Sequence, residues 1–221
     1  MLPADVNRPP AHLQYIAIEG VIGVGKTSLA HRLAEYFGGR VLLEKHEENP
    51  FLKDFYANPK QYAFQTQLFF LLSRYRQQQE IPQRELFHSL LVADYIFAKD
   101  RIFASLNLEA RELFLYDKIA SLLEQDVPRP DLVLYLQSNT KRLMANIQRR
   151  NRDYEKHITE DYIRALNEAY NRFFINYKTS PLLIINTTQI DFVNNDADFH
   201  DLVEQVTRPI SGTQYYSPTG R

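Results

Sequence analysis

Short apolar segments alternate along the chain with longer segments in which apolar residues recur at helical spacing. The apolar segments, interpreted as strands, lie at 15–19, 40–44, 90–94, 131–136 and 182–186. The segments with helical spacing lie at 27–37, 59–79, 109–125, 139–150, 160–178 and 199–206. Near-continuous apolar strands that alternate with helices are typical of a parallel sheet covered on both faces. The pattern therefore predicts an α/β fold with a five-stranded parallel sheet flanked by helices.

The length of the chain limits the number of domains. Its 221 residues, 44% of them hydrophobic, are enough for one well-buried domain and too few for two independent ones. The two ends contain Pro, Gly and Ser and lack the periodicity of a helix or strand. We therefore expect a single domain over residues 1–221, with loose ends at about 1–13 and 209–221.

Charge and residue types narrow the possible partners. The formal net charge is −1, from 26 Lys and Arg against 27 Asp and Glu, so no overall field would hold DNA or RNA. There is no Cys, and the six His lack ligand spacing, which argues against disulfides, thiol catalysis and a structural zinc. The N-terminal segment lacks the apolar core of a signal peptide, and no segment approaches transmembrane length. We therefore expect a cytoplasmic protein without a membrane or nucleic-acid partner.

A glycine-rich motif follows the first predicted strand. Residues 20–27 read GVIGVGKT, which matches the GxxxxGK[ST] pattern and contains three of the chain's seven glycines. Glycine permits backbone conformations that turn successive N–H groups toward phosphate oxygens at a helix N-terminus. The lysine then reaches the β- and γ-phosphates, and the threonine hydroxyl can bind Mg²⁺. The motif predicts a catalytic lysine and a binding site for ATP and Mg²⁺ formed by Gly20, Gly23, Gly25, Lys26, Thr27 and Ser28.

Acidic residues end two further predicted strands. Asp94 ends LLVAD, where it could share a Mg²⁺ with Thr27; alternatively, it caps the helix that follows. Glu44 ends LLE at the carboxyl edge of the predicted sheet, where a carboxylate can accept a proton from a hydroxyl group. Glu44 could instead belong to a solvated acidic cluster with Glu47 and Glu48. We favour a metal ligand at Asp94 and a catalytic base at Glu44.

The spacing of these motifs indicates a family. The NKxD and DxxG motifs of a GTPase are absent from the sequence. From IEGVIGVGKT to about residue 186, the chain instead resembles the deoxynucleoside kinases, which include deoxycytidine, deoxyguanosine and bacterial deoxyadenosine kinases. The resemblance implies a P-loop kinase fold with an arginine-rich lid, a homodimer, and ATP-dependent 5′-phosphorylation of deoxyadenosine, deoxyguanosine or deoxycytidine. It also matches Glu44 to the family's catalytic carboxylate, although Lys45 replaces the proline that follows it.

Several residues match positions that bind the acceptor in this family. Tyr56, Gln67 and Arg74 match residues for the sugar 3′-hydroxyl and the base. Gln67 and Arg74 are seven residues apart, so a helix projects both from one face, and an amide can pair with a base edge. The alternative is a solvated polar stripe on an amphipathic helix. Asp100 matches the acid that pairs with the equivalent of Arg74, and Phe103 is a candidate to stack on the base.

The segment NIQRRNRDYE, residues 146–155, resembles the family's lid, which closes over the triphosphate. Arg150 and Arg152 match lid arginines, and Glu155 matches the acid that contacts the 3′-hydroxyl. Arginine suits bidentate phosphate contacts, so we expect Arg149, Arg150 and Arg152 to be catalytic. The alternative is a basic, solvated helix face.

The chain departs from the family at three further positions. Tyr95 replaces an arginine that supplies a cation to the transition state. Asn146 and Asn151 replace an arginine against the donor adenine and a glycine in the lid. Because tyrosine stays neutral near pH 7, we expect Arg101 or Arg149 to supply the missing charge.

Two rival functions stay open at this point. A nucleoside monophosphate kinase similar to thymidylate kinase would share the P-loop and the arginine lid, but it needs cations for the acceptor phosphate. A carboxylate at Glu44 would repel such an acceptor and favours a neutral nucleoside. A non-catalytic regulator that binds a nucleotide is the other alternative, with Tyr95 and Asn146 as signs of lost activity.

Overall fold

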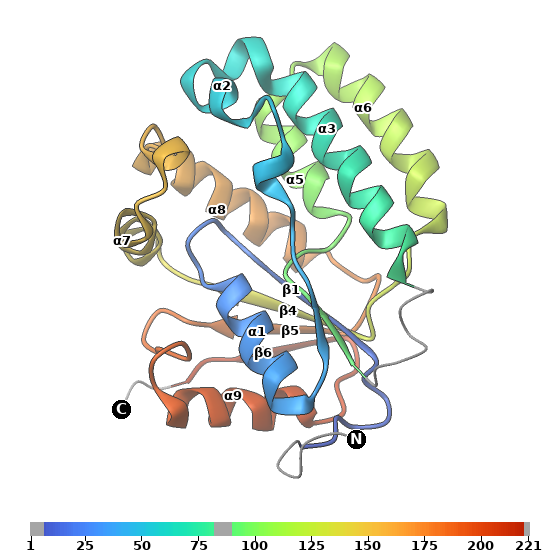
Figure 1. Cartoon of the computed structure of the whole chain (residues 1–221), viewed down its shortest axis with the longest axis vertical. Coiled ribbons are helices and arrows are strands. Elements are labelled where there is room, and N and C mark those ends of the chain that lie inside the picture. The colour runs from blue at the N-terminus through green and yellow to red at the C-terminus, as the bar shows by residue number, and fades with distance from the viewer. Residues whose placement is uncertain (1–6, 82–89, 219–221) are drawn as a thin grey trace.

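A parallel β-sheet forms the centre of the molecule (Figure 1). The structure, a computed structural model, describes residues 7–81 and 90–218. Within this part of the chain the sheet has six strands in the order β2-β3-β1-β4-β5-β6. The strands are β1 (Tyr15–Gly20), β2 (Arg40–Leu42), β3 (Leu91–Ala93), β4 (Leu132–Gln137), β5 (Leu182–Asn186) and β6 (Thr213–Tyr216). The predicted α/β fold with a parallel sheet is confirmed, but the predicted number of five strands is wrong.

The sixth strand lies in the segment for which we predicted a loose C-terminal end. β6 pairs in parallel with β5, with Thr213 opposite Leu182. Its sequence, TQYY, has no apolar run, and most of its side chains are exposed. An edge strand of this kind is held by backbone hydrogen bonds rather than by a buried face, so hydrophobic patterning does not reveal it. The prediction of a loose end is therefore wrong for residues 213–216, while residues 1–6 and 219–221 lie outside the described part.

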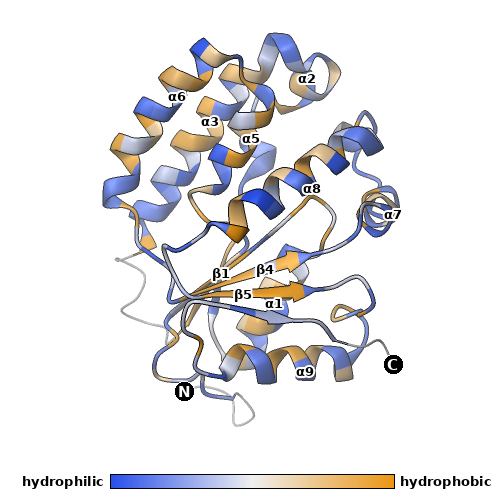
Figure 2. Cartoon of the chain, turned by 180° about the vertical axis from the view of Figure 1, so that it is seen from behind, coloured by the Kyte–Doolittle hydropathy of each residue, from blue (hydrophilic) through white to orange (hydrophobic). Residues whose placement is uncertain are grey.

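Helices cover both faces of the sheet (Figure 2). α1 and α9 lie on one side, where Tyr36 of α1 contacts Phe199 of α9, and α8 lies on the other. On the α8 side, Phe174 stacks on Tyr135 of β4 at 4.2 Å between ring centroids. The helices are α1 (Lys26–Phe37), α2 (Leu52–Ala57), α3 (Pro59–Gln79), α5 (Lys99–Asn107), α6 (Ala110–Leu123), α7 (Thr140–Arg150), α8 (Glu160–Ile175) and α9 (Asp196–Thr207). No described helix is long and apolar enough to cross a membrane.

A second layer of helices lies on the same side of the sheet as α8, further from the strands (Figure 1). α3, α5 and α6 pack around their own small hydrophobic cluster, which includes Leu71, Phe97 and Tyr116. α5 also contacts α8, which joins this layer to the main core. The arrangement matters for function because β1, β2 and β3 are parallel and end at the same edge of the sheet, where Glu44 contacts Arg74 of α3 and Lys99 of α5. Residues that follow these three strands therefore meet between the sheet and the helical layer.

Candidate active site

The glycine-rich loop connects β1 to the N-terminus of α1. Gly23 has a φ of 86°, and a Cβ there would lie 2.7 Å from the carbonyl oxygen of Leu143. Gly25, the N-cap of α1, has a φ of 102°, and a Cβ there would lie 3.0 Å from the Phe192 ring. Other residues would be both strained and crowded at these positions. The loop can therefore turn tightly around a small anion only with glycine at these points.

Lys26 lies partly buried within this loop. Its Nζ donates hydrogen bonds to the carbonyl oxygens of Gly20 and Val21, at 2.7 and 3.3 Å. Burial, together with the nearby positive charge of Lys99, lowers the pKa of Lys26 to about 8. The lysine thus occupies the centre of its own loop, where a phosphate group would compete with the two carbonyl oxygens for its protons.

Asp94, at the end of β3, connects the loop to the end of β2. Its Oδ2 accepts a hydrogen bond from Thr27 Oγ1 at 2.6 Å, and its Oδ1 accepts one from the backbone N–H of Glu44 at 2.8 Å. A hydroxyl and a carboxylate oxygen so close together are the hard ligands that Mg²⁺ prefers, with phosphate oxygens and water completing its shell. The alternative reading of Asp94 as a helix cap is wrong, because α5 begins at Lys99 with Ala98 as its N-cap.

Four charged side chains form a buried charge cluster between the sheet and the helical layer. Arg74 of α3 forms ion pairs with both Glu44 and Asp100, and the Nζ of Lys99 lies 2.5 Å from the Oε2 of Glu44. The exposed fractions of the four side chains are 14% for Glu44, 6% for Lys99, 3% for Arg74 and 2% for Asp100. Two cations and two carboxylates cancel, so the cluster carries no net charge, which limits the cost of burying it.

The cluster determines the protonation state of Glu44. Burial alone would raise the pKa of this carboxyl, but the positive charges of Arg74 and Lys99 outweigh burial and hold the pKa well below its usual range. Glu44 is therefore ionised at neutral pH. The alternative of a solvated acidic cluster is wrong for Glu44, because its side chain is only 14% exposed, whereas that of Glu47 is 76% exposed. Glu44 points inward, whereas Glu47 lies on the surface.

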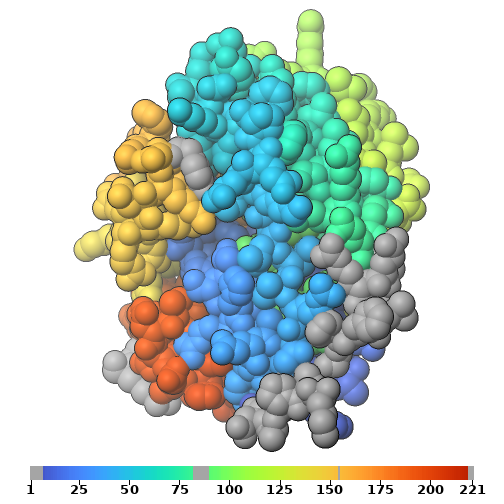
Figure 3. Space-filling view, in the orientation of Figure 1, coloured from blue at the N-terminus to red at the C-terminus, as the bar shows by residue number. Residues whose placement is uncertain are grey.

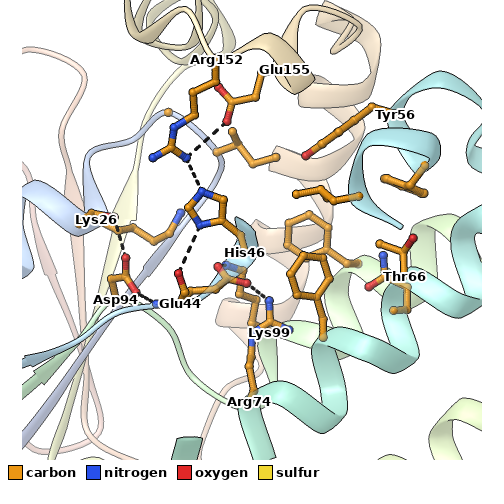
Figure 4. A pocket seen from close by; sticks show the side chains of 18 of the residues that line it. Lys26, Glu44, His46, Tyr56, Thr66, Arg74, Asp94, Lys99, Arg152 and Glu155 are labelled. Carbon is orange, nitrogen blue, oxygen red and sulfur yellow. Dashed lines mark hydrogen bonds and ion pairs between the residues drawn. The ribbon is translucent and has the colours of Figure 1, made fainter. Parts of the chain in front are cut away.

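The acceptor residues predicted from the sequence, except Asp100, line one cavity together with Glu44, Lys99 and Arg74 (Figure 4), while Asp100 lies behind Arg74 and lines a different cavity. Tyr56 comes from α2, Gln67 from α3, Phe103 from α5 and Glu155 from the segment after α7. Gln67 is buried, and its Oε1 has no hydrogen-bond partner among the described residues. The alternative of a solvated stripe on α3 is therefore wrong, because Gln67 and Arg74 both face inward. An unpaired buried amide oxygen is costly unless a ligand or water completes it.

The lid arginines lie above this cavity. Arg150 donates to both carboxylate oxygens of Glu155, at 3.1 and 2.5 Å, and Arg152 contacts the Nε2 of His46 at 2.8 Å. His46 follows β2, so the contact joins the lid segment to the loop that carries Glu44. Figure 3 shows the two segments, in yellow and light blue, meeting on one face of the molecule.

A second cavity lies on the other side of Lys26. The glycine-rich loop, Ser28, Arg142, Arg149 and residues 190–193 line it. Asn146 donates a hydrogen bond to the carbonyl oxygen of Gly23 at 2.9 Å and accepts one from Arg149 at 3.2 Å. The hydrogen bond from Asn146 to Gly23 thus connects α7 to the glycine-rich loop. The residues that border both cavities are Gly23, Lys26, Thr27, Arg150 and Arg152.

Two of the residues singled out in the sequence line neither of these two cavities. Arg101 is on the surface of α5, 46% exposed, with its Nε 3.0 Å from Asp117. The prediction that Arg101 could supply the missing positive charge is therefore wrong. Tyr95 is fully buried and its hydroxyl donates to Gln77 at 3.3 Å. Sequence reasoning missed Lys99; its only signal was its place beside Asp100, where a basic residue reads as part of a helix surface.

The site places a glycine-rich, anion-binding loop beside Glu44, a carboxylate that follows a parallel strand of the same sheet. Arg150 and Arg152 line the cavity next to both. That combination on a parallel sheet defines a P-loop kinase. The family model described as Deoxynucleoside kinase matches residues 16–211 of the chain. The chain belongs to the deoxynucleoside kinase family, and it is an enzyme that phosphorylates deoxynucleosides.

Individual relatives agree with this assignment. The chain is 35% identical to a deoxyguanosine kinase of Bacillus subtilis over 197 residues, which cover 87% of this chain and 95% of that protein. It is 34% identical to a deoxyadenosine kinase of Dictyostelium discoideum, over 78% of this chain and 71% of that protein. Among solved structures, a deoxyadenosine kinase from M. mycoides with bound dATP has a TM-score of 0.77 at 23% identity, with 88% of this chain and all of that chain covered. The last comparison supports the fold alone.

Proposed function

We propose that this kinase transfers the γ-phosphoryl group of ATP to the 5′-hydroxyl of deoxyadenosine, deoxyguanosine or deoxycytidine. The observation that carries the proposal is the pair of hydrogen bonds at Asp94, which join Thr27 of the glycine-rich loop to the backbone of Glu44. They hold the phosphate-binding side and the acceptor side of the site at a fixed distance. Such fixed positioning contributes much of the catalysis of phosphoryl transfer. A cytoplasmic location stays a prediction.

The donor side depends on the residues of the second cavity. The glycine-rich loop and Ser28 bind the phosphates, and Lys26 exchanges the carbonyl oxygens of Gly20 and Val21 for phosphate oxygens. Thr27 and Asp94 would hold Mg²⁺, which supplies positive charge against the triphosphate when it is bound. Arg149, Arg150 and Arg152 add hydrogen bonds to the transferred group as the lid closes.

The acceptor side depends on Glu44. Its carboxylate is ionised, and it accepts the proton of the 5′-hydroxyl as the new O5′–P bond forms and the bond to the ADP oxygen breaks. Tyr56 and Glu155 bind the 3′-hydroxyl at the other end of the sugar. The two cations deepest in this cavity, Arg74 and Lys99, are already paired with carboxylates. That pairing favours a neutral nucleoside over a nucleoside monophosphate as the acceptor.

The proposal is tested by ADP release from ATP with the purified protein. The acceptors are the four deoxynucleosides and their four monophosphates, each at the same concentration. We expect turnover with deoxyadenosine, deoxyguanosine or deoxycytidine and little with any monophosphate. Turnover confined to monophosphates would support a thymidylate-like kinase instead, and the absence of turnover with nucleotide binding retained would support a regulator.

The base is read by Gln67 and by the pair formed by Arg74 and Asp100. The free Oε1 of Gln67 accepts a hydrogen bond from an amino group, and the ion pair holds the guanidinium plane against acceptor atoms of a purine or cytosine. The 5-methyl group of thymine would press against this charged pair and needs an apolar space instead. Thymidine is therefore expected to be the poorest natural substrate.

Replacing Arg74 with Met and Asp100 with Ala together is expected to raise the kcat/KM ratio of thymidine to deoxyadenosine. The double change opens apolar volume without leaving an unpaired charge. Because Arg74 also holds Glu44, kcat should fall for every substrate, so the ratio is the readout. Asp100→Ala alone should impair all substrates without raising the ratio. Arg101→Met, on the surface of the same helix, is the control; an unchanged ratio in the double variant would show that the pair does not read the base.

The homodimer implied by the family resemblance has a candidate surface on α6. The exposed fractions of Phe114, Leu115 and Leu122 are 66%, 51% and 69%. Leu115 and Leu122 are seven residues apart, so they lie on one side of the helix, with Phe114 within a quarter of a turn or so. Large apolar side chains grouped on one exposed helix face are typical of a surface that another protein covers.

Glutamate at both Phe114 and Leu122 is expected to convert a dimer into a monomer, because it puts charges into an apolar interface. Light scattering coupled to size-exclusion chromatography measures the mass. Ile175→Glu, which changes an apolar side chain that is 70% exposed on α8, is the matched control and should leave the mass unchanged. A wild-type protein that elutes as a monomer at all concentrations would contradict the proposed dimer.

A further inference from the structure

Lys99 is a buried lysine at the first position of α5. Its Nζ lies 2.5 Å from the Oε2 of Glu44, and its side chain is only 6% exposed. The same Nζ lies 5.7 Å from the centre of the Phe103 ring, one turn further along the helix. A lysine held away from water in this way needs a carboxylate partner, and Glu44 provides it. The lysine is therefore fixed rather than free to sample solvent.

The two oxygens of the Glu44 carboxylate have different partners. Oε1 pairs with Arg74, whose charge is shared with Asp100, while Oε2 pairs with Lys99. Figure 4 shows Lys99 rising toward Glu44, with Lys26 on the far side of that residue. The positive charge of Lys99 also contributes to the lowered pKa of Lys26. Lys99 thus lies close to both the acceptor side and the phosphate-binding side of the site.

The other residues considered as the cation beside Glu44 make contacts with other groups. Tyr95 is neutral and directed at Gln77, and Arg101 is paired with Asp117 on the surface. Arg149 lines the second cavity and donates to Asn146. Among the described residues, Lys99 and Arg74 are the cations in ion-pair contact with Glu44.

We propose that Lys99 is the positioning residue of the acceptor side, which holds the Glu44 carboxylate in the orientation that accepts the 5′-hydroxyl proton. The inference rests on the proposed function, in which Glu44 is the base. Lys99 itself neither gains nor loses a proton in the reaction; the proton passes from the hydroxyl to Glu44 while ADP leaves.

The proposal is tested by comparing Lys99→Met, Lys99→Arg and the surface control Arg101→Met. A small displacement of a catalytic group is enough to cost about 10²-fold in rate, so kcat of Lys99→Met should fall by about that factor. The KM values for ATP and nucleoside should change far less. Lys99→Arg should retain more activity than Lys99→Met because it keeps the charge, and Arg101→Met should match the wild type. Equal kcat in Lys99→Met and the wild type would overturn the proposal.

The pH profile separates positioning from a merely structural role. Loss of a neighbouring cation makes a carboxylate easier to protonate, so the acidic limb of kcat against pH should move to higher pH in Lys99→Met. It should not move in Arg101→Met. If kcat falls in Lys99→Met but the acidic limb of its pH profile does not move, then Lys99 does not act through Glu44. If the methionine variant does not fold, Lys99→Gln, which keeps a hydrogen-bond donor but not the charge, is compared with Lys99→Arg in the same way.

A double-mutant cycle with Glu44→Gln completes the test. If Lys99 acts through Glu44, then Lys99→Met should cost little further activity once Glu44 is already glutamine. An equal loss in both backgrounds would overturn the positioning role. The cycle also separates this inference from the proposed function. Normal kcat in Glu44→Gln would contradict the proposal that Glu44 is the base. Impaired kcat in Glu44→Gln together with normal kcat in Lys99→Met would contradict only the role of Lys99.

Discussion

Glu44→Gln is expected to lower kcat by about 10²–10⁴-fold, the usual contribution of a general base. Glutamine has nearly the same shape as glutamate but cannot accept the proton of the 5′-hydroxyl. The loss should lie in kcat at saturating substrates, since the cavity proposed for ATP lies on the other side of Lys26. Steady-state ADP release measures the effect.

Glu47→Gln is the matched control, because it removes an exposed carboxylate from the same loop. It should leave kcat unchanged. Melting temperatures of both variants are also needed, since Glu44→Gln leaves Arg74 and Lys99 without one of their carboxylate partners. A folded Glu44→Gln variant with near-normal kcat would exclude Glu44 from the mechanism.

Lys26→Ala is expected to lower the rate of phosphoryl transfer by about 10²–10³-fold, as with loss of a single preorganised donor to a transition state. The lysine is partly buried in its loop, where its Nζ donates to the carbonyl oxygen of Gly20 at 2.7 Å, so it is already held at the proposed phosphate site. Single-turnover transfer at saturating ATP isolates this step from binding. Lys45→Ala, which removes an exposed lysine beside Glu44, is the control. Unimpaired transfer in Lys26→Ala would contradict the assignment of the loop.

The hydrophobic pattern predicted five strands and most of the helices because those elements bury a continuous apolar face. It failed at β6, where backbone pairing to β5 rather than side-chain burial holds four mostly exposed residues. It also did not predict α2, whose six residues are too short to display a period. Both failures concern elements that the rest of the fold stabilises.

The predictable part of the site consists of residues tied to strand ends. The loop at Gly23, Glu44 and Asp94 follow β1, β2 and β3, and parallel strands bring their carboxyl ends to one edge. The sequence alone could not show which of Lys99 and Arg101 faces the site. They are two positions apart in one helix, yet one faces Glu44 and the other faces solvent. Which basic residue is buried depends on how α5 packs against α3 and α8, and no local pattern carries that information.

The charged side chains of the site fall into two groups, which dissolved salt screens to different extents. In the buried charge cluster, Arg74 and Lys99 are shielded from the solvent and from its ions. The lid arginines Arg150 and Arg152 have side chains that are 35% and 33% exposed, within reach of the ionic atmosphere. Counter-ions screen exposed charges far more than buried pairs. Raising the ionic strength should therefore weaken the capture of the triphosphate while leaving the chemical step of the saturated enzyme nearly unchanged.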